Sequence, residues 1–182
     1  TGILPIKKYG TESALNNFDE FTMLQPDVLA EYSGFTEQEV RGLYETYHMD
    51  FEKARQWYDG YRLGEGLHIY NPKSVVDSIR RKRMGNYWTS TETYESLRKY
   101  ISMNFDGLKD DVTQMLAGGE CRVNPAKFQN DMASFKSKDD ILTLLVHLGY
   151  LSYDEENQKV FIPNEEVKSE YVNAIEDDGW TL

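Results

Sequence analysis

Cysteine is almost absent from this chain of 182 residues. Its single cysteine, Cys121, excludes a disulfide framework and a cysteine-based zinc site within one chain. So little cysteine is typical of proteins from reducing compartments, and we therefore expect a cytoplasmic protein. Long apolar runs are missing as well, since no stretch approaches the roughly 18 apolar residues that a membrane-spanning helix needs. The sequence predicts neither a transmembrane protein nor a membrane partner.

Basic residues are also scarce. The chain has 20 Lys and Arg against 31 Asp and Glu, a formal net charge of −11. This balance disfavours broad, charge-driven binding to nucleic acid. Hydrophobic residues make up 40% of the chain, so its composition is that of a folded protein. No basic and then apolar leader is visible, and the first residue is Thr1, so we expect no signal peptide and either a processed N-terminus or a piece of a longer protein.

Helix signals dominate residues 36–117. Thr36 and Glu39 form a capping box, and apolar residues follow at helical spacing. A short helix is predicted over residues 51–58. The glycine-rich stretch 59–70 predicts an irregular or hairpin connection.

Three more elements complete this helical part. Asn71-Pro72 predicts the start of a helix, because proline fits a first turn. The predicted apolar face of that helix is Val75, Val76 and Ile79. Ser90 can cap the next helix, whose apolar side is Tyr94, Leu97 and Ile101. A further apolar stripe consists of Leu108, Val112, Met115 and Leu116.

The pattern changes after Gly119. Residues 121–123 predict a short strand, and Ser137 predicts the start of a helix that ends at Gly149. Strands at 151–153 and 160–162 then flank a polar turn, and Pro163-Asn164 opens a last helix. This order of helix, strand, turn, strand and helix is typical of a winged helix. We therefore predict a mainly α chain with a small β component, in which a helical domain precedes a winged-helix domain.

Several short motifs are more specific than periodicity. They are Thr1-Gly2-Ile3-Leu4-Pro5-Ile6, Gly34-Phe35-Thr36-Glu37-Gln38-Glu39-Val40, Trp57-Tyr58-Asp59-Gly60-Tyr61-Arg62, Tyr70-Asn71-Pro72-Lys73-Ser74-Val75, Asn86-Tyr87-Trp88-Thr89-Ser90, His147-Leu148-Gly149-Tyr150-Leu151 and Ile162-Pro163-Asn164-Glu165-Glu166-Val167. Together, in this order, they resemble the bacterial predicted AAA-ATPase-like family. The resemblance covers nearly the whole chain.

The resemblance implies a protein of three parts: a P-loop ATPase core, a helical lid with a winged helix, and often a PD-(D/E)XK nuclease-like domain. This chain resembles the middle part alone. Residues 1–35 would be the edge of the ATPase core and a linker, 36–118 the lid and 119–178 the winged helix. Its partners in cis would be the missing core and the nuclease-like domain.

The chain lacks the elements of phosphoryl transfer. No G-x-x-x-x-G-K-[ST] loop occurs, and no apolar strand ends in paired acids that would hold magnesium. We expect that this chain alone is not an enzyme and carries no cofactor. ATP and magnesium are implied for the full-length protein through its missing core.

A nucleotide contact is implied at one turn of the chain. In related ATPases a proline that starts a lid helix packs against the adenine, and Tyr70, Asn71 and Pro72 match that element by position. Helix N-terminal amides would face the nucleotide, and Tyr70 would offer a stacking surface. Thr1 would be a remnant of the sensor position. The alternative is an ordinary first-turn proline with a capping asparagine, and a frayed terminus at Thr1.

Two groups of residues are candidates for an interaction surface. Trp57, Tyr58, Tyr61 and Arg62 would contact the ATPase core or a base, although such aromatic clusters more often form the core of a small domain. The only basic run includes Arg80, Arg81 and Arg83. It would bind a phosphate, or it is a solvated patch that suits the C-terminal end of a helix dipole.

The predicted winged helix raises the alternative of a nucleic-acid-binding or protein-interaction module. The helix before the wing would offer Lys138, Asp139, Asp140, Thr143 and His147 on its non-apolar side. The wing offers Asp154, Glu155 and Glu156, which would repel phosphates. These residues therefore disfavour DNA binding through the wing and favour protein packing.

Three other features predict no chemistry. Glu166-Val167-Lys168 spells the E-x-K of a nuclease core, but it falls at a helix start and not on a strand. The three histidines, His48, His68 and His147, lack zinc-ligand spacing, so no metal site is predicted. Cys121 has no evident base beside it and is expected to be inert.

Overall fold

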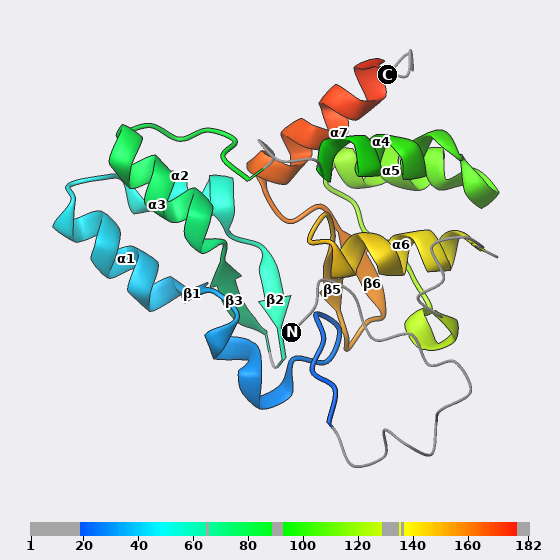
Figure 1. Ribbon diagram of the computed structural model, residues 1–182, viewed down its shortest axis with the longest axis horizontal. Coiled ribbons are helices and arrows are strands. Elements are labelled where there is room, and N and C mark those ends of the chain that lie inside the picture. The colour runs from blue at the N-terminus through cyan, green and yellow to red at the C-terminus, as the bar shows by residue number, and fades with distance from the viewer. Residues whose placement is uncertain (1–18, 65, 89–92, 129–134, 136, 178–182) are drawn as a thin grey trace.

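A computed structural model describes residues 19–64, 66–88, 93–128, 135 and 137–177. These residues form a mixed α/β structure with two small, three-stranded antiparallel sheets. The expectation of a mainly α chain thus holds only in part, because two sheets accompany the helices. The helices beside each sheet come from the same part of the sequence as its strands (Figure 1). Within the described residues, no helix is both long enough and apolar enough to cross a bilayer.

The first unit runs from residue 27 to residue 81. Its elements are η1 (Asp27–Tyr32), β1 (Phe35–Thr36), α1 (Glu37–Thr46), α2 (Phe51–Tyr58), β2 (Tyr61–Leu63), β3 (Leu67–Tyr70) and α3 (Pro72–Arg81). Of the two alternatives predicted for residues 59–70, the hairpin is present as β2 and β3. The strand order is β1-β3-β2, so β3 also pairs with β1.

The second unit runs from residue 93 to residue 177. Its elements are α4 (Thr93–Ser102), η2 (Phe105–Gly107), α5 (Leu108–Leu116), β4 (Cys121–Arg122), η3 (Pro125–Lys127), α6 (Lys138–His147), β5 (Ser152–Asp154), β6 (Lys159–Phe161) and α7 (Glu165–Asp177). The strand order is β4-β6-β5, with α6 between β4 and β5 in the chain. The helices and strands predicted after Gly119 are therefore confirmed.

Local hydrogen bonds explain where the helices begin. The predicted capping box is present, since Thr36 Oγ1 accepts from the Glu39 amide at 3.4 Å and the Thr36 amide donates to Glu39 Oε2 at 2.8 Å. Asn71 Oδ1 accepts from the Lys73 amide at 2.9 Å, which places Pro72 in the first turn of α3 as predicted.

Each unit has its own hydrophobic core. The core of the first unit is rich in tyrosine and consists of Val40, Tyr44, Phe51, Ala54, Tyr58, Tyr70, Val75 and Ile79, and Tyr87 from the segment after α3 completes it. The core of the second unit is larger, and includes Leu97 and Ile101 of α4, five residues of α6 and Tyr171 of α7; the α6 residues are Ile141, Leu142, Leu144, Leu145 and Val146. The prediction that Val76 belongs to the apolar face of α3 was wrong, because Val76 is 43% exposed and does not share the buried face of that helix.

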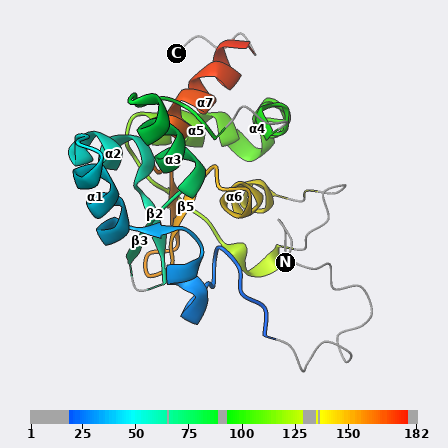
Figure 2. The same cartoon turned by 60° about the vertical axis from the view of Figure 1, so that its left-hand side comes forward.

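The two units lie side by side. Strand β2 contacts β5, and α2 contacts the start of α7, so the joint runs along one edge of each unit (Figures 1 and 2). The Arg62 amide donates to Ser152 Oγ at 3.2 Å across this joint. The motif at residues 1–6 and the predicted Ser90 cap lie outside the described residues.

Candidate functional site

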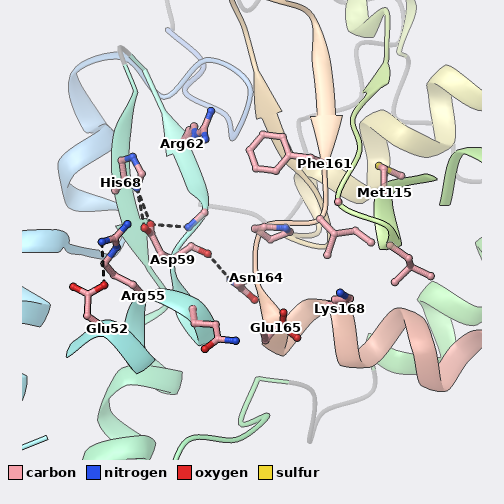
Figure 3. A pocket seen from close by; sticks show the side chains of 16 residues that line it. Glu52, Arg55, Asp59, Arg62, His68, Met115, Phe161, Asn164, Glu165 and Lys168 are labelled. Atoms are coloured by element: carbon pink, nitrogen blue, oxygen red, sulfur yellow. Dashed lines mark hydrogen bonds and ion pairs between the residues drawn. The ribbon is translucent and has the colours of Figure 1, made fainter. Parts of the chain in front are cut away.

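The joint between the units contains a pocket of about 550 Å³ (Figure 3). Its walls come from α2 and the β2–β3 hairpin on one side and from the end of α5, β6 and the start of α7 on the other. Phe161 and Met115 give it an apolar side, whereas Arg62 and Lys168 bring positive charge. None of the described lining residues carries a hydroxyl or a thiol, so the lining offers no serine, threonine or cysteine nucleophile.

Gly60 fixes the close approach of the two walls. Its backbone has a φ of +106°, and a Cβ at this position would lie 2.0 Å from the Pro163 carbonyl oxygen. Next to it, Asn164 Nδ2 donates to the Asp59 carbonyl at 2.8 Å. Only glycine fits here, because both the dihedral angle and the space exclude a side chain.

Asp59 holds the imidazole of His68 at the edge of this pocket. Nδ1 of His68 lies 2.8 Å and 3.0 Å from the two carboxylate oxygens of Asp59. Oδ1 of Asp59 also accepts from the Gly60 amide at 2.6 Å, which fixes the carboxylate from its other side. Such a carboxylate orients an imidazole and selects its tautomer, as is needed for proton transfer or metal ligation.

Glu37 approaches the same pair from the start of α1. Glu37, Asp59 and His68 each offer a ligand atom, and these atoms lie within 4.8 Å of one another. They come from a helix start, a helix end and a strand, so no spacing rule could have brought them together in the sequence. The residue types are those of a transition-metal site, which the histidine spacing did not predict.

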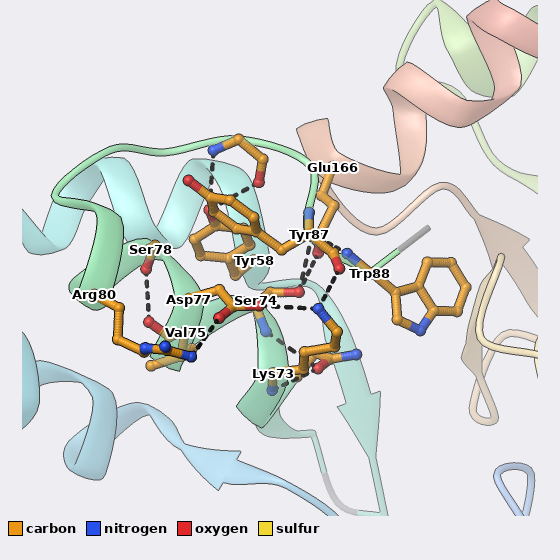
Figure 4. Close-up of polar contacts among 12 residues, drawn as sticks. Tyr58, Lys73, Ser74, Val75, Asp77, Ser78, Arg80, Tyr87, Trp88 and Glu166 are labelled. Carbon is orange, nitrogen blue, oxygen red and sulfur yellow. Dashed lines mark hydrogen bonds and ion pairs between the residues drawn. The ribbon is translucent and has the colours of Figure 1, made fainter. Parts of the chain in front are cut away.

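Glu166 forms a second polar centre at the joint (Figure 4). Its oxygens accept from Ser74 Oγ at 2.9 and 2.8 Å, and Oε1 also accepts from the amides of Tyr87 at 2.8 Å and Trp88 at 3.1 Å. The side chain is only 3% exposed. Burial raises the pKa of Glu166, and the hydrogen bonds from Tyr87, Ser74 and Trp88 oppose that rise.

The segment 86–88 is held to α7 by more than Glu166. Asn86 Nδ2 donates to Ser169 Oγ at 3.1 Å and to Glu170 Oε1. The Trp88 ring packs edge-on against Tyr150, with ring centroids 4.9 Å apart. This segment connects α3 to the second unit, so several independent contacts fix the two units to each other.

Five of the motifs noted in the sequence meet at this joint. Their contacts are Gly60 with Pro163, Ser74 with Glu166, Asn86 with Glu170, and Tyr61 with the Gly149 carbonyl, which accepts from the Tyr61 hydroxyl at 2.7 Å. The motifs are therefore one spatial cluster, although they are spread over more than 100 positions. The sequence alone did not indicate this clustering.

The predicted nucleotide-binding residues lie in a different setting from the one expected. Tyr70 is fully buried in the core of the first unit, so its ring is not available as a stacking surface in this conformation. Asn71 is occupied as the cap of α3, and Pro72 is exposed in the first turn. Thr1 lies outside the described residues.

The aromatic candidates mostly have structural roles. Tyr58 is buried and its hydroxyl donates to the Gly85 carbonyl at 2.9 Å, and Trp57 packs at the edge of the same core. Tyr61 contributes to the joint through its bond to Gly149. Arg62 is exposed at the pocket, with its guanidinium 5.2 Å from the centre of the Phe161 ring.

The basic run lies at the exposed end of α3. Arg80 pairs with Asp77 at 3.6 Å, Arg81 lies 5.4 Å from the centre of the Tyr87 ring, and Arg83 is exposed. These side chains do not line the described pockets, so they form a surface separate from the joint.

The face of α6 that was expected to be polar is buried. Thr143 and His147 are 1% and 7% exposed, and burial lowers the pKa of His147 to about 4. Phe128, just after η3, packs against the His147 ring at a centroid distance of 5.5 Å. The prediction that Thr143 and His147 face outward was wrong, because the residues of α6 from Ile141 to His147 are all buried.

No family model matches this sequence, and the searches of curated proteins and of solved structures also found no match. The resemblance to the AAA-ATPase-like family therefore stays a prediction from its motifs.

Proposed function

We propose that this chain is a non-enzymatic coupling module, the lid and winged-helix part of a P-loop ATPase. Its role would be to close over nucleotide bound by the ATPase core and to pass that state to neighbouring domains. The proposal is supported by the order of motifs and by the strand order β4-β6-β5 with α6 between β4 and β5, an arrangement that is consistent with a winged helix.

The Ser74–Glu166 contact carries the coupling role. Ser74 lies in the first turn of α3, two residues after Pro72, and α3 begins at the turn that would approach the adenine. Glu166 lies in the first turn of α7, in the proposed winged-helix unit. A shift of the Asn71-Pro72 turn would therefore reach α7 through one hydrogen-bonded contact, without passing through a flexible linker.

The burial of Tyr70 disfavours an adenine contact through its ring. Stacking by Tyr70 would require the core of the first unit to open. The exposed ring of Pro72 and the adjoining backbone would therefore make the adenine contact. Asn71 would hold the turn through its bonds to the amides of Lys73 and Ser74.

The test uses a longer protein in which this chain is joined to its P-loop core. Pro72→Ala should weaken ATP binding in calorimetry, whereas Pro125→Ala, at the first turn of η3, serves as the matched control and should not. Ser74→Ala should leave ATP affinity within about threefold of wild type while it reduces the nucleotide-dependent change in distance between spin labels on α3 and α7. Equal ATP affinity in the Pro72 and Pro125 variants would overturn the adenine contact, and an unchanged label distance in Ser74→Ala would overturn the coupling.

A protein-interaction module is the second candidate, favoured by a hollow of about 410 Å³ beside the wing. Its described lining has three acids, Asp139, Glu155 and Glu156, against the single base Arg122. This charge suits a basic protein segment and repels nucleic acid. A shift of labelled duplex DNA by this chain that weakens steeply with salt would contradict that preference.

A further inference from the structure

Glu37, Asp59 and His68 form a cluster in the first unit, at the edge of the pocket. This cluster has no part in the proposed coupling role. Two carboxylates and an imidazole with ligand atoms within 4.8 Å of one another match the donors that first-row transition metals use. The His68 side chain is 39% exposed and that of Asp59 is 13% exposed. Both also line the pocket, so the cluster can be reached from solvent.

Tyr70 provides an independent observation at the same place. Its side chain is fully buried, and its hydroxyl makes no well-formed hydrogen bond. Asp59, Glu37 and Arg55 lie close to this hydroxyl. Tyr70 follows His68 by two positions in β3, so both side chains leave the strand on the same face. The hydroxyl therefore faces the cluster, where a bound ion or its water would provide the missing partner.

We propose that Glu37, Asp59 and His68 bind a divalent transition-metal ion, with zinc as the probe of choice. The imidazole favours zinc, copper, iron or nickel over magnesium and calcium, which prefer sites made of oxygen ligands alone. The 2.8 Å contact between His68 Nδ1 and Asp59 would be replaced by coordination to the ion. This proposal does not depend on the ATPase assignment.

The two neighbouring arginines already have carboxylate partners. Arg41 pairs with Oε1 of Glu37 at 2.8 Å, but both side chains are exposed by 40% or more, so this ion pair is weak and readily yields. Arg55 is engaged by Glu52 at 3.2 Å. The site joins the start of α1, the end of α2 and strand β3, so the ion would tie α1 to two of the elements that line one wall of the pocket.

The experiment titrates ZnCl2 into the chelator-treated 182-residue chain by calorimetry. Wild type should bind one equivalent. His68→Gln and Glu37→Gln should each weaken that binding at least tenfold. The matched controls are His48→Gln and Glu45→Gln, which change exposed residues near the end of α1 and should leave affinity within twofold of wild type. Tyr70→Phe removes only the hydroxyl and should weaken binding less than the ligand variants do.

A spectroscopic readout separates loss of the site from loss of the fold. Cobalt substituted for zinc should give visible d–d absorption in wild type and in His48→Gln, and none in His68→Gln, with circular dichroism unchanged among the three. The proposal is overturned if wild type binds no zinc at millimolar concentration, or if the His68 and Glu37 variants bind it as tightly as wild type. Loss of binding in His48→Gln equal to that in His68→Gln would also overturn it, because the metal would then lie elsewhere.

Discussion

Ser74 and Glu166 are 92 positions apart in the sequence, yet the Ser74 hydroxyl lies 2.8 Å from a carboxylate oxygen of Glu166. Both side chains are buried, and the same carboxylate accepts two backbone amides from residues 87 and 88. A buried acid with this many donors is a specific connection between the two units, since removing it would leave several polar groups without partners.

Glutamine should replace Glu166 far better than alanine does. Its amide oxygen can accept from the Tyr87 and Trp88 amides, and its NH2 group can donate to Ser74 Oγ. We expect Glu166→Gln to change the free energy of unfolding by less than about 1 kcal/mol, and Glu166→Ala to lower it by about 2–4 kcal/mol. Urea unfolding followed by circular dichroism measures both. A loss for glutamine as large as that for alanine would contradict the contacts described.

The raised pKa of Glu166 predicts a pH dependence. Because the pKa is higher in the folded state than the ordinary 4.5, the folded protein binds this proton more tightly than the unfolded chain does. The stabilisation that protonated Glu166 gives the folded state is therefore fully present below about pH 4.5, and it is lost as pH rises through the folded-state pKa. The difference in unfolding free energy between wild type and Glu166→Gln, measured in steps from pH 4.5 to pH 8, should shift against wild type as pH rises. A difference that does not change with pH would contradict the raised pKa.

Gly60 should be intolerant of any side chain. Alanine there would adopt a φ of +106° and place its Cβ 2.0 Å from the Pro163 carbonyl oxygen, so the two walls of the pocket would have to separate. We expect Gly60→Ala to cost at least about 2 kcal/mol of unfolding free energy. Gly42→Ala is the matched control, because Gly42 lies within α1 with open space around it and should gain about 0.5–1 kcal/mol. Equal effects at the two positions, measured by denaturant unfolding, would be inconsistent with this tight contact.

Local signals in the sequence predicted most of the elements. The Thr36–Glu39 box, the Asn71-Pro72 start and the Gly149 end each depend on residues within a few positions of one another, and each is present. Strand β1 was missed because its two residues, Phe35 and Thr36, directly precede α1, where Thr36 was assigned as the helix cap. It exists because β3 pairs with it, which is a tertiary effect.

The site could not be predicted in the same way. Glu166 was set aside as a chance match, since nothing near it in the sequence distinguishes a buried glutamate from an exposed one at a helix start. Its partners are 78 to 92 positions away. The outward face of α6 was mispredicted for a related reason, since burial of Thr143 and His147 depends on segments that pack against the helix from elsewhere in the chain.

Cys121 should be unreactive in the folded protein. It is buried, and burial together with the nearby Asp111 raises the pKa of its thiol to about 11, so little thiolate is present at pH 8. We expect slow reaction with a thiol-specific disulfide reagent in buffer and complete reaction within minutes in 6 M guanidinium. Fast labelling of the folded chain would mean that β4 opens readily, contrary to its pairing with β6.

His147 should make the folded state sensitive to acid. Burial lowers its pKa to about 4 in the folded protein against 6.5 ordinarily, so the unfolded chain binds the proton more tightly. The contribution of neutral His147 is therefore present above about pH 6.5 and is lost as pH falls toward 4, the opposite direction to Glu166. Between pH 7 and pH 5 this amounts to roughly 1–2 kcal/mol. Leucine at this position keeps the side chain apolar, so the difference in unfolding free energy between His147→Leu and wild type should move in favour of the variant by that amount over the same pH step. If the difference is the same at both pH values, His147 takes up its proton as readily in the folded protein as in the unfolded chain, and α6 is more open to water than its burial indicates.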